Sequence, residues 1–316
     1  MTQSLAAVAE IAHGWVTLPT GTRLHYERAG KGQPVLLLHG IADSTRAWRH
    51  VMAPLAAEYD VIALDLPGCG RSDKPETDYS LGAQAAAVRF FLDALSLDLV
   101  TVVGHSLGGG VAMTFSYHYP ERVGRLALVA SGGLGRDLHP MFKAATLPVV
   151  PKYVVRLLFD RRIRRVRNFV QLLYGQFGRD PLFVNPWAYR AELAELLEAM
   201  ESPGAQAAFF SMLGSASNVA GQAVSALDRL HLARFPFLIV WGKEDRVFPV
   251  AHGVRAATLV PHARLVVLDG CGHLPQIECA DRFIRVLRRW LRSTTPVRLQ
   301  VKAVIGAGGI TQRVVA

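Results

Sequence analysis

A serine sits where an apolar run meets a cluster of glycines, and this stretch constrains the fold of the chain more than any other. Residues 99–103 are predicted to form a buried strand and residues 111–119 a helix, so Gly104-His105-Ser106-Leu107-Gly108 fills the corner between them. Such a corner holds the serine on a strained backbone with its hydroxyl exposed, while the two glycines let strand and helix approach closely. Ser106 is therefore predicted to be a nucleophile.

Further apolar runs on both sides of this corner indicate the rest of the sheet. They are continuous rather than alternating and are separated by stretches of helical length, which is typical of a parallel sheet covered by helices on both faces. The predicted strands of this kind are residues 35–38, 61–64, 99–103, 126–129, 237–241 and 265–268. Residues 14–18 and 23–27 alternate instead and predict a hairpin at the start of the sheet. The expected fold class is therefore α/β, with a mostly parallel sheet.

The strand pattern is interrupted between residues 134 and 230. This segment has helical stretches but no buried-strand run, and loops of such length without structure of their own are uncommon in a compact domain. We therefore predict a helical cap at 134–230, inserted into a core formed by 1–133 and 231–292. Residues 293–316 are predicted to be a C-terminal tail that is flexible or packed at an edge.

A serine hydroxyl becomes a good nucleophile only beside a histidine that takes its proton and a carboxylate that orients this histidine. His273 follows the predicted strand 265–268, and Asp245 follows the strand 237–241. Both therefore belong to the strand ends where catalytic groups gather in parallel sheets. The resulting order of serine, aspartate and histidine along the chain is the one that a strand-turn-helix serine requires.

The carboxylate has two rival candidates. Glu244 is the immediate neighbour of Asp245, and Asp137 comes after the predicted strand 126–129. Asp245 is preferred because it lies further into its turn and precedes an apolar stretch that can bury it. At the level of sequence, both rivals remain open.

A third requirement is a set of backbone amides that bind the negative oxygen formed during acyl transfer. A His-Gly-Ile sequence at 39–41 follows the strand 35–38, and its glycine would let backbone amides face the pocket. We predict that the amides of Ile41 and Leu107 form this oxyanion hole. Three further residues are predicted to support the pocket: His39, Gly40 and His105.

Composition excludes several classes of protein. With 35 Lys and Arg against 25 Asp and Glu, the formal net charge is +10, which suggests a basic surface patch but indicates no nucleic-acid partner. Cys69, Cys271 and Cys279 form no Cys-x-x-Cys pair, so neither a disulfide framework nor a zinc site is predicted. Cys271 is interpreted as a small apolar filler. Because the chain shows no secretory signal and no run of about eighteen apolar residues, a cytoplasmic location is predicted.

Together the motifs resemble those of the α/β-hydrolase superfamily, and the similarity runs from about residue 14 to residue 291. It rests on His39-Gly40, on the glycine-containing stretches 65–73, 104–109 and 242–245, and on Gly272-His273. The resemblance implies an eight-stranded, mostly parallel sheet with helices on both faces, a cap inserted after the sixth strand, and neither a metal nor an organic cofactor. It says far less about the substrate.

Ser106 separates this chain from some branches of that superfamily. Haloalkane dehalogenases and epoxide hydrolases have a similar layout but carry aspartate as the nucleophile. Carbon–carbon hydrolases of aromatic ring-cleavage products have a serine, usually preceded by asparagine where this chain has His105. The expected function is therefore hydrolysis of carboxylic ester or related acyl bonds of a fairly apolar small molecule, through an acyl-enzyme. A carbon–carbon hydrolase, an acyltransferase and a ligand-sensing receptor on the same fold remain open.

The predicted cap should determine specificity, and two of its features allow more than one interpretation. A basic stretch is either a solvated helix face or a lid that contacts anionic lipid; its cations are Lys152, Arg156, Arg161, Arg162, Arg164, Arg165 and Arg167. Several aromatic residues either pack the cap or line an acyl pocket: Tyr174, Trp187, Phe209 and Phe210. Nothing in the sequence indicates an oligomeric state.

Overall fold

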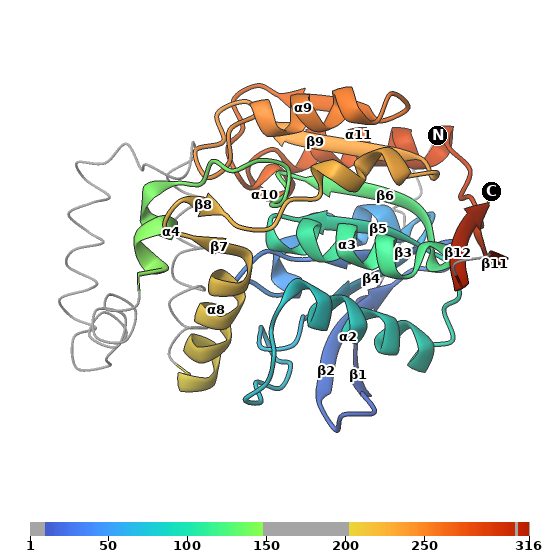
Figure 1. Ribbon diagram of the computed structural model, residues 1–316, viewed down its shortest axis with the longest axis horizontal. Helices are drawn as coiled ribbons and strands as arrows, with labels where there is room; N and C mark the ends of the chain where they lie inside the picture. Colours follow the sequence, from blue (N-terminus) through green and yellow to red (C-terminus); the bar gives the residue numbers. More distant parts are fainter. Residues whose placement is uncertain (1–9, 148–201, 307–308, 316) are drawn as a thin grey trace, which may run out of the picture.

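The computed structural model describes residues 10–147, 202–306 and 309–315, and its centre is an eight-stranded sheet (Figure 1). The strands along the sheet are β1 (Ala12–Thr17), β2 (Arg23–Ala29), β4 (Asp60–Leu64), β3 (Pro34–Leu38), β5 (Val100–His105), β6 (Val123–Val129), β9 (Phe237–Gly242) and β10 (Arg264–Leu268). β1 pairs antiparallel with β2, and β2 with β4, whereas the other neighbours in this sheet are parallel. The predicted mostly parallel sheet and its N-terminal hairpin are confirmed.

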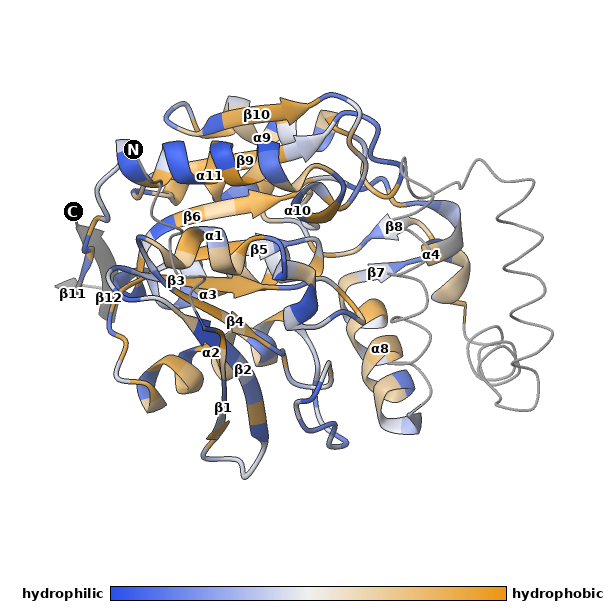
Figure 2. Cartoon of the chain, turned by 180° about the vertical axis from the view of Figure 1, so that it is seen from behind, coloured by the Kyte–Doolittle hydropathy of each residue, from blue (hydrophilic) through white to orange (hydrophobic). Residues whose placement is uncertain are grey.

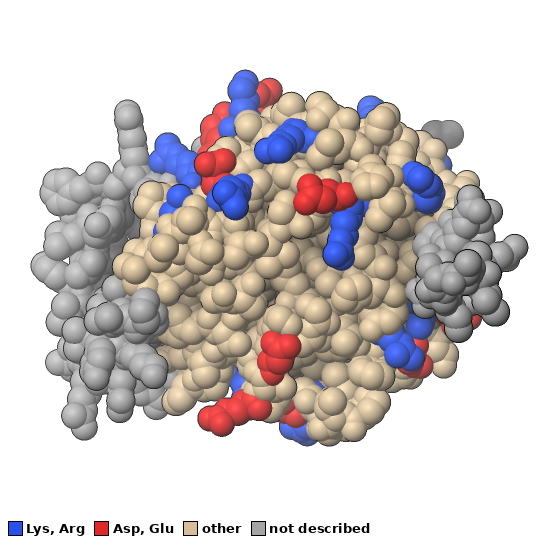
Figure 3. Space-filling model, viewed as in Figure 1, with Lys and Arg blue, Asp and Glu red and all other residues tan. Residues whose placement is uncertain are grey.

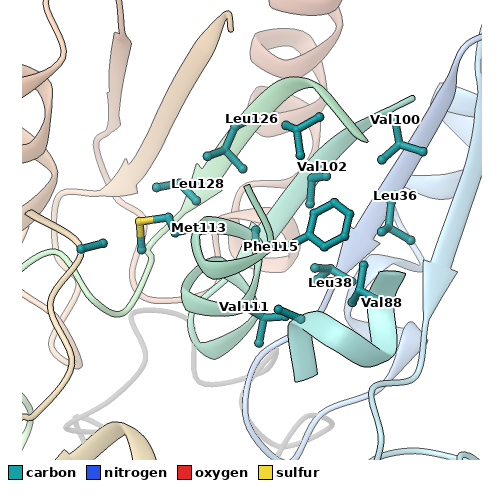
Figure 4. Packing of buried hydrophobic residues seen from close by; sticks show 14 of the residues in the cluster. Leu36, Leu38, Val88, Val100, Val102, Val111, Met113, Phe115, Leu126 and Leu128 are labelled. Carbon is teal, nitrogen blue, oxygen red and sulfur yellow. The ribbon is translucent and has the colours of Figure 1, made fainter. Parts of the chain in front are cut away.

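Helices cover both faces of this sheet. They are α1 (Met52–Ala56), α2 (Leu81–Ala94), α3 (Leu107–His118), α9 (Ala251–Leu259), α10 (Pro275–Glu278) and α11 (Ala280–Ser293), with short 3-10 helices η1 (Thr45–Trp48) and η2 (Pro120–Arg122). Because strand side chains alternate between faces, Leu36 and Leu38 of β3 join a core with α2 and α3, while Val35 and Leu37 join a second core with α1 and α11. Figure 4 shows Leu36 and Leu38 packed near Phe115 of α3.

Helix α11 shows why such segments become helices. Its buried side chains recur three and four residues apart, as an amphipathic helix requires, and they are Phe283, Ile284, Leu287, Trp290 and Leu291. Arg285 and Arg289 between them are exposed, and the helix carries alternating hydrophobic and hydrophilic bands in Figure 2. On the face drawn in Figure 3, acidic and basic side chains of the described residues are interspersed, so the positive charge is not gathered there into one patch.

The structure differs from the sequence prediction at two helices. The apolar spacing of Trp48, Met52, Leu55 and Ala56 predicts a single helix there, but the structure divides this region into η1 and α1. Pro54 lacks an N–H and its ring would clash with the carbonyl four residues earlier, so one continuous helix across this region is unfavourable. Helix α3 begins at Leu107, four residues before its predicted start at Val111, because Gly108, Gly109 and Gly110 are themselves helical.

Between β6 and β9 the structure describes α4 (Pro140–Ala145), α8 (Pro203–Ala216), a small hairpin of β7 (Ser217–Asn218) and β8 (Gly221–Gln222), and η5 (Leu227–Leu232). The rest of the predicted cap lies outside the described residues. α4, α8 and the small hairpin lie at one end of the sheet in Figure 1, and the C-terminal segment lies at the opposite end.

The C-terminal segment, predicted as a tail, contains two strands. Its strands β11 (Gln300–Gly306) and β12 (Gly309–Val315) pair antiparallel with each other, as a two-stranded sheet separate from the main one. Within the described ranges, no helix has the length and apolar character needed to cross a membrane.

Candidate active site

Ser106 occupies a strained corner between β5 and α3. Its φ of 52° and ψ of −117° lie in a region that residues with a side chain rarely adopt. Backbone hydrogen bonds hold this conformation, because the amide of Ser106 donates to the Val129 carbonyl at 3.0 Å and its carbonyl accepts from Gly109 and Gly132, each at 3.0 Å. Strain maintained by its surroundings is characteristic of functional positions. The corner has the geometry that the glycine pattern predicts.

The two flanking glycines are required by close backbone contacts. A β-carbon at Gly104 would lie 2.4 Å from the carbonyl oxygen of Gly108, and one at Gly108 would lie 2.4 Å from the carbonyl oxygens of Leu38 and His39. Real β-carbons do not approach oxygen so closely, so any larger residue would push α3 away from β3 and β5. These glycines therefore fix the position of Ser106 relative to the sheet.

The structure brings Ser106, His273 and Asp245 together although they follow three different strands. The Nε2 atom of His273 lies 3.0 Å from the Ser106 hydroxyl oxygen, and its Nδ1 atom lies 2.9 Å from Oδ2 of Asp245. The other oxygen of Asp245 accepts from the amides of Val247 at 2.8 Å and Phe248 at 3.0 Å. With Asp245 ionised, the network assigns a proton to Nδ1 and leaves Nε2 able to take the serine proton.

The rival acids lie elsewhere. Glu244 accepts a hydrogen bond at 2.9 Å from the backbone amide of Cys271, so it braces the loop that carries His273 without reaching the ring. Asp137 contacts a different histidine, with its Oδ2 atom 3.1 Å from Nε2 of His252. Neither carboxylate is the partner of the histidine that faces Ser106.

The predicted oxyanion-hole residues lie on both sides of this serine. Leu107 is the first residue of α3, so its amide has no acceptor within the helix. On the other side, a β-carbon at Gly40 would lie 3.1 Å from Nδ1 of His105 and 3.3 Å from Cβ of Ser106, so only glycine fits there easily. Ile41, the next residue, packs against the apolar cluster that contains Leu107.

The predicted supporting histidines are buried and make separate contacts. The Nδ1 atom of His39 lies 2.7 Å from the Gly40 carbonyl oxygen, and its Nε2 atom accepts from the Leu66 amide at 3.0 Å. Burial lowers the pKa of His39. His105 lies behind the candidate triad, with its Nε2 atom 2.9 Å from the backbone carbonyl oxygen of His273. Burial and the neighbouring His273 hold the pKa of His105 well below its usual value. Both rings are therefore neutral near pH 7 and hold the neighbouring backbone through hydrogen bonds.

An apolar wall completes the described part of the site. Leu107 and Ile41 pack with residues of α8 and of the loop after β4 in one cluster, whose other members include Cys69, Tyr79, Ala208 and Met212. α8 approaches closely because residue 68 is a glycine, where a β-carbon would lie 2.7 Å from Cβ of Ala208.

Sequence reasoning missed Ala208 and Met212 and named the neighbouring aromatic residues instead. Phe209 lines a small pocket together with Ala42, Cys69 and Lys74. Tyr174 and Trp187 lie outside the described residues, as does the basic stretch from Lys152 to Arg167, whose contact with anionic lipid stays a prediction. In the ranges that the structure describes, no group of three or more metal-binding side chains is assembled.

This sheet order and serine corner define a hydrolase architecture. The chain belongs to the α/β-hydrolase fold family, whose family model matches residues 33–280. It is 37% identical over 293 residues to an uncharacterised protein of Mycobacterium tuberculosis, covering 92% of this chain and 85% of the relative. Over 270 residues it is 32% identical to a 2-hydroxy-6-oxo-6-phenylhexa-2,4-dienoate hydrolase of Burkholderia cepacia, covering 84% and 89% respectively. An esterase from Rhodococcus sp. ECU1013 has a similar structure, with 26% identity, a TM-score of 0.69, and coverage of 89% of this chain and 99% of that one.

Proposed function

We propose that this hydrolase cleaves carboxylic esters of apolar acids, with Ser106 as nucleophile, His273 as general base and Asp245 as the acid that orients it. The observation that carries the proposal is the 3.0 Å separation between Nε2 of His273 and the hydroxyl oxygen of Ser106, at a strained corner. A serine held in this way beside a neutral imidazole can attack a carbonyl carbon as its proton passes to the histidine.

The reaction follows from these contacts. Ser106 attacks the ester carbonyl, His273 takes the hydroxyl proton, and the amides of Ile41 and Leu107 bind the resulting oxyanion. Protonated His273, stabilised by Asp245 at 2.9 Å, then gives its proton to the departing alcohol. Water enters, loses a proton to His273 and hydrolyses the acyl-enzyme by the same steps, which regenerates Ser106.

The surroundings of the candidate triad favour an ester over a ring-cleavage product. Cleavage of a dienoate requires a ketonisation step first, and therefore polar groups that deliver a proton to carbon. His105 occupies the position usually held by asparagine in such enzymes, but it is buried and its Nε2 atom is engaged by the His273 carbonyl. The described wall beside Leu107 is apolar and suits an acyl chain.

The second candidate function is carbon–carbon bond hydrolysis. It is favoured by the 32% identity to the dienoate hydrolase of Burkholderia cepacia. The sequence offers Arg190 as a clamp for the substrate carboxylate, although that residue lies outside the described ranges. Under this alternative, the same serine and histidine would act on a carbon–carbon bond.

A paired assay tests the proposal. One portion of the purified protein is labelled with a fluorophosphonate, and a separate, unlabelled portion is assayed on p-nitrophenyl esters of graded acyl length and on a 2-hydroxy-6-oxo-dienoate. We expect turnover of short to medium esters, no cleavage of the dienoate, and a loss of kcat of about a million-fold in Ser106→Ala. Faster consumption of the dienoate than of any ester, abolished by Arg190→Gln, would support the second candidate. Ligand binding without turnover of either substrate would indicate a receptor.

A further inference from the structure

Two cysteines come close together at the base of the loop that carries His273. Cys271 lies three residues after β10, and Cys279 immediately precedes α11. Sγ of Cys279 lies 3.5 Å from the carbonyl oxygen of Gly270, the residue before Cys271. Both side chains are buried in the same apolar core, with exposed fractions of 0% for Cys271 and 7% for Cys279. The third cysteine, Cys69, contacts Met212 of α8 instead. The pair therefore closes a short loop with His273 inside it.

The surroundings of the two sulfurs differ. Nη2 of Arg282 lies 2.7 Å from Sγ of Cys279 and donates to it, and this sulfur also lies 3.5 Å from the carbonyl oxygen of Gly270. Cys279 is in addition the residue before the first turn of a fourteen-residue helix. A guanidinium group and a helix N-terminus both stabilise a thiolate. Burial, together with its hydrogen bond to Cys279, raises the pKa of Cys271. Cys279 is thus the sulfur of the pair that has a cationic donor beside it.

We propose that Cys279 and Cys271 form a peroxide-reactive pair whose disulfide inhibits the hydrolase by displacing His273. The Cys279 thiolate attacks one oxygen of hydrogen peroxide, the O–O bond breaks, and hydroxide leaves and takes up a proton to become water. The resulting sulfenic acid is attacked by the sulfur of Cys271, which forms the S–S bond and expels a second water. Two thiols and one peroxide become one disulfide and two waters, so the sulfurs lose the two electrons that the peroxide oxygens gain. Because little of the Cys279 side chain is exposed, only a small oxidant can reach its sulfur.

The backbone contacts of the loop connect this bond to the candidate triad. The Cys271 amide donates to the Glu244 carboxylate at 2.9 Å, and the Cys271 carbonyl accepts from the Glu244 amide at 3.0 Å. At the other end, the Glu278 carboxylate accepts from the amides of Gly272 at 3.0 Å and Leu274 at 2.9 Å. His273 is therefore clamped between the residues that must move when the sulfurs approach to the bonding distance of about 2 Å. A displacement of roughly 1 Å of a catalytic group can cost about a hundredfold in rate.

Formation of the disulfide does not depend on the proposed function, whereas the inhibition rests on it. The full chain is treated with hydrogen peroxide, its remaining thiols are alkylated, and its peptides are analysed by mass spectrometry, while ester hydrolysis is followed in parallel. We expect a Cys271–Cys279 cross-linked peptide, a loss of at least tenfold in kcat, and recovery of activity with dithiothreitol. Cys279→Ser should form no cross-link and keep its activity in peroxide, whereas the control Cys69→Ser should still form the cross-link and lose at least tenfold of its own untreated activity.

Each of the other possible results contradicts a specific part of the proposal. Peroxide treatment that leaves both thiols free, or that adds oxygen to Cys279 without a cross-link, would show that Cys271 and Cys279 do not form a peroxide-reactive pair. A cross-link that forms without loss of activity would overturn the displacement of His273. If untreated protein hydrolyses no ester, the proposed function fails, and the peptide masses alone then decide whether the pair exists.

Discussion

The Nε2 atom of His105 lies 2.9 Å from the backbone carbonyl oxygen of His273, so the residue before the candidate nucleophile is bonded to the main chain of its base. The two rings are 5.0 Å apart and tilted by 52°. A carbonyl oxygen can only accept, so the proton of the neutral His105 ring lies on Nε2 and is donated to His273. The strand that delivers Ser106 thereby also positions His273.

Removing this hydrogen bond should slow the chemistry without weakening substrate binding. We expect His105→Phe, which keeps a ring and loses the donor, to lower kcat about tenfold, the equivalent of one hydrogen bond, with KM nearly unchanged. His105→Gln retains a donor of similar reach and should recover part of the rate. Steady-state kinetics on one ester checks this, after circular dichroism has shown that both variants fold. A Phe variant with wild-type kcat would contradict the positioning role.

The assignment of the acid predicts unequal effects at neighbouring carboxylates. Asp245→Asn should lower kcat by roughly ten thousand-fold, because an amide at this place favours the wrong tautomer of His273. Glu244→Gln keeps an oxygen that can accept from the Cys271 amide and should have only a small effect. The kcat of each variant on the same ester is the measurement. A larger loss in the Glu244 variant would reverse the assignment.

Two buried histidines predict how stability depends on pH. Burial lowers the pKa of His39 and, with the neighbouring His273, that of His105 from the ordinary value of 6.5. The unfolded chain therefore binds more protons below about pH 6.5, so the stabilisation is complete above that pH and is lost as the pH falls toward the folded-state values. The free energy of unfolding should drop by up to about 1.4 kcal/mol per pH unit for each histidine.

Urea unfolding at pH 7.5, 6.5 and 5.5 measures this dependence. His105→Gln removes one of the two groups and should show a shallower slope over the same range. The same slope in the variant and the wild type would mean that His105 takes up its proton equally well in the folded and in the unfolded protein.

Glycines of one helix should respond in opposite ways to a methyl group. Gly108→Ala places a β-carbon 2.4 Å from two backbone carbonyl oxygens and should cost about 3 kcal/mol or more in stability. At Gly110, also in α3, the β-carbon would meet Leu81 methyl groups at ordinary contact distances of 3.4 and 3.5 Å. Gly110→Ala should therefore be neutral or stabilise the protein by up to about 1 kcal/mol. Thermal unfolding of both variants compares them directly, and equal effects would be inconsistent with the close packing of α3 on β3.

The sheet could be predicted from the sequence because each buried strand is a continuous apolar run, and such runs differ clearly from their surroundings. The same holds for the grouping of Ser106, His273 and Asp245, since parallel strands end at one edge of the sheet. The wall formed by Met212 and Ala208 could not be predicted, because it depends on how α8 lies against the core.

The approach of Cys271 to Cys279 also escaped sequence reasoning, although both lie in one short stretch of the chain. Their approach requires the loop that carries His273 to fold back on itself, and no pattern in the sequence of this loop predicts that turn. The separation of η1 from α1 could have been predicted from the proline at position 54, but the apolar spacing in this region favoured a single helix.

Strands β6 and β9 are direct neighbours, paired from Leu126 with Phe237 to Val129 with Val240, although about a third of the chain separates them. The polypeptide thus leaves the sheet and re-enters it at adjacent positions, so the strands themselves set the spacing between Ser106 and the loops after β9 and β10. The segment between β6 and β9 can therefore be exchanged without changing the sheet. Exchanging it with that of a relative should transfer substrate preference while the reactive groups stay in place, so that selectivity and chemistry can evolve separately in this architecture.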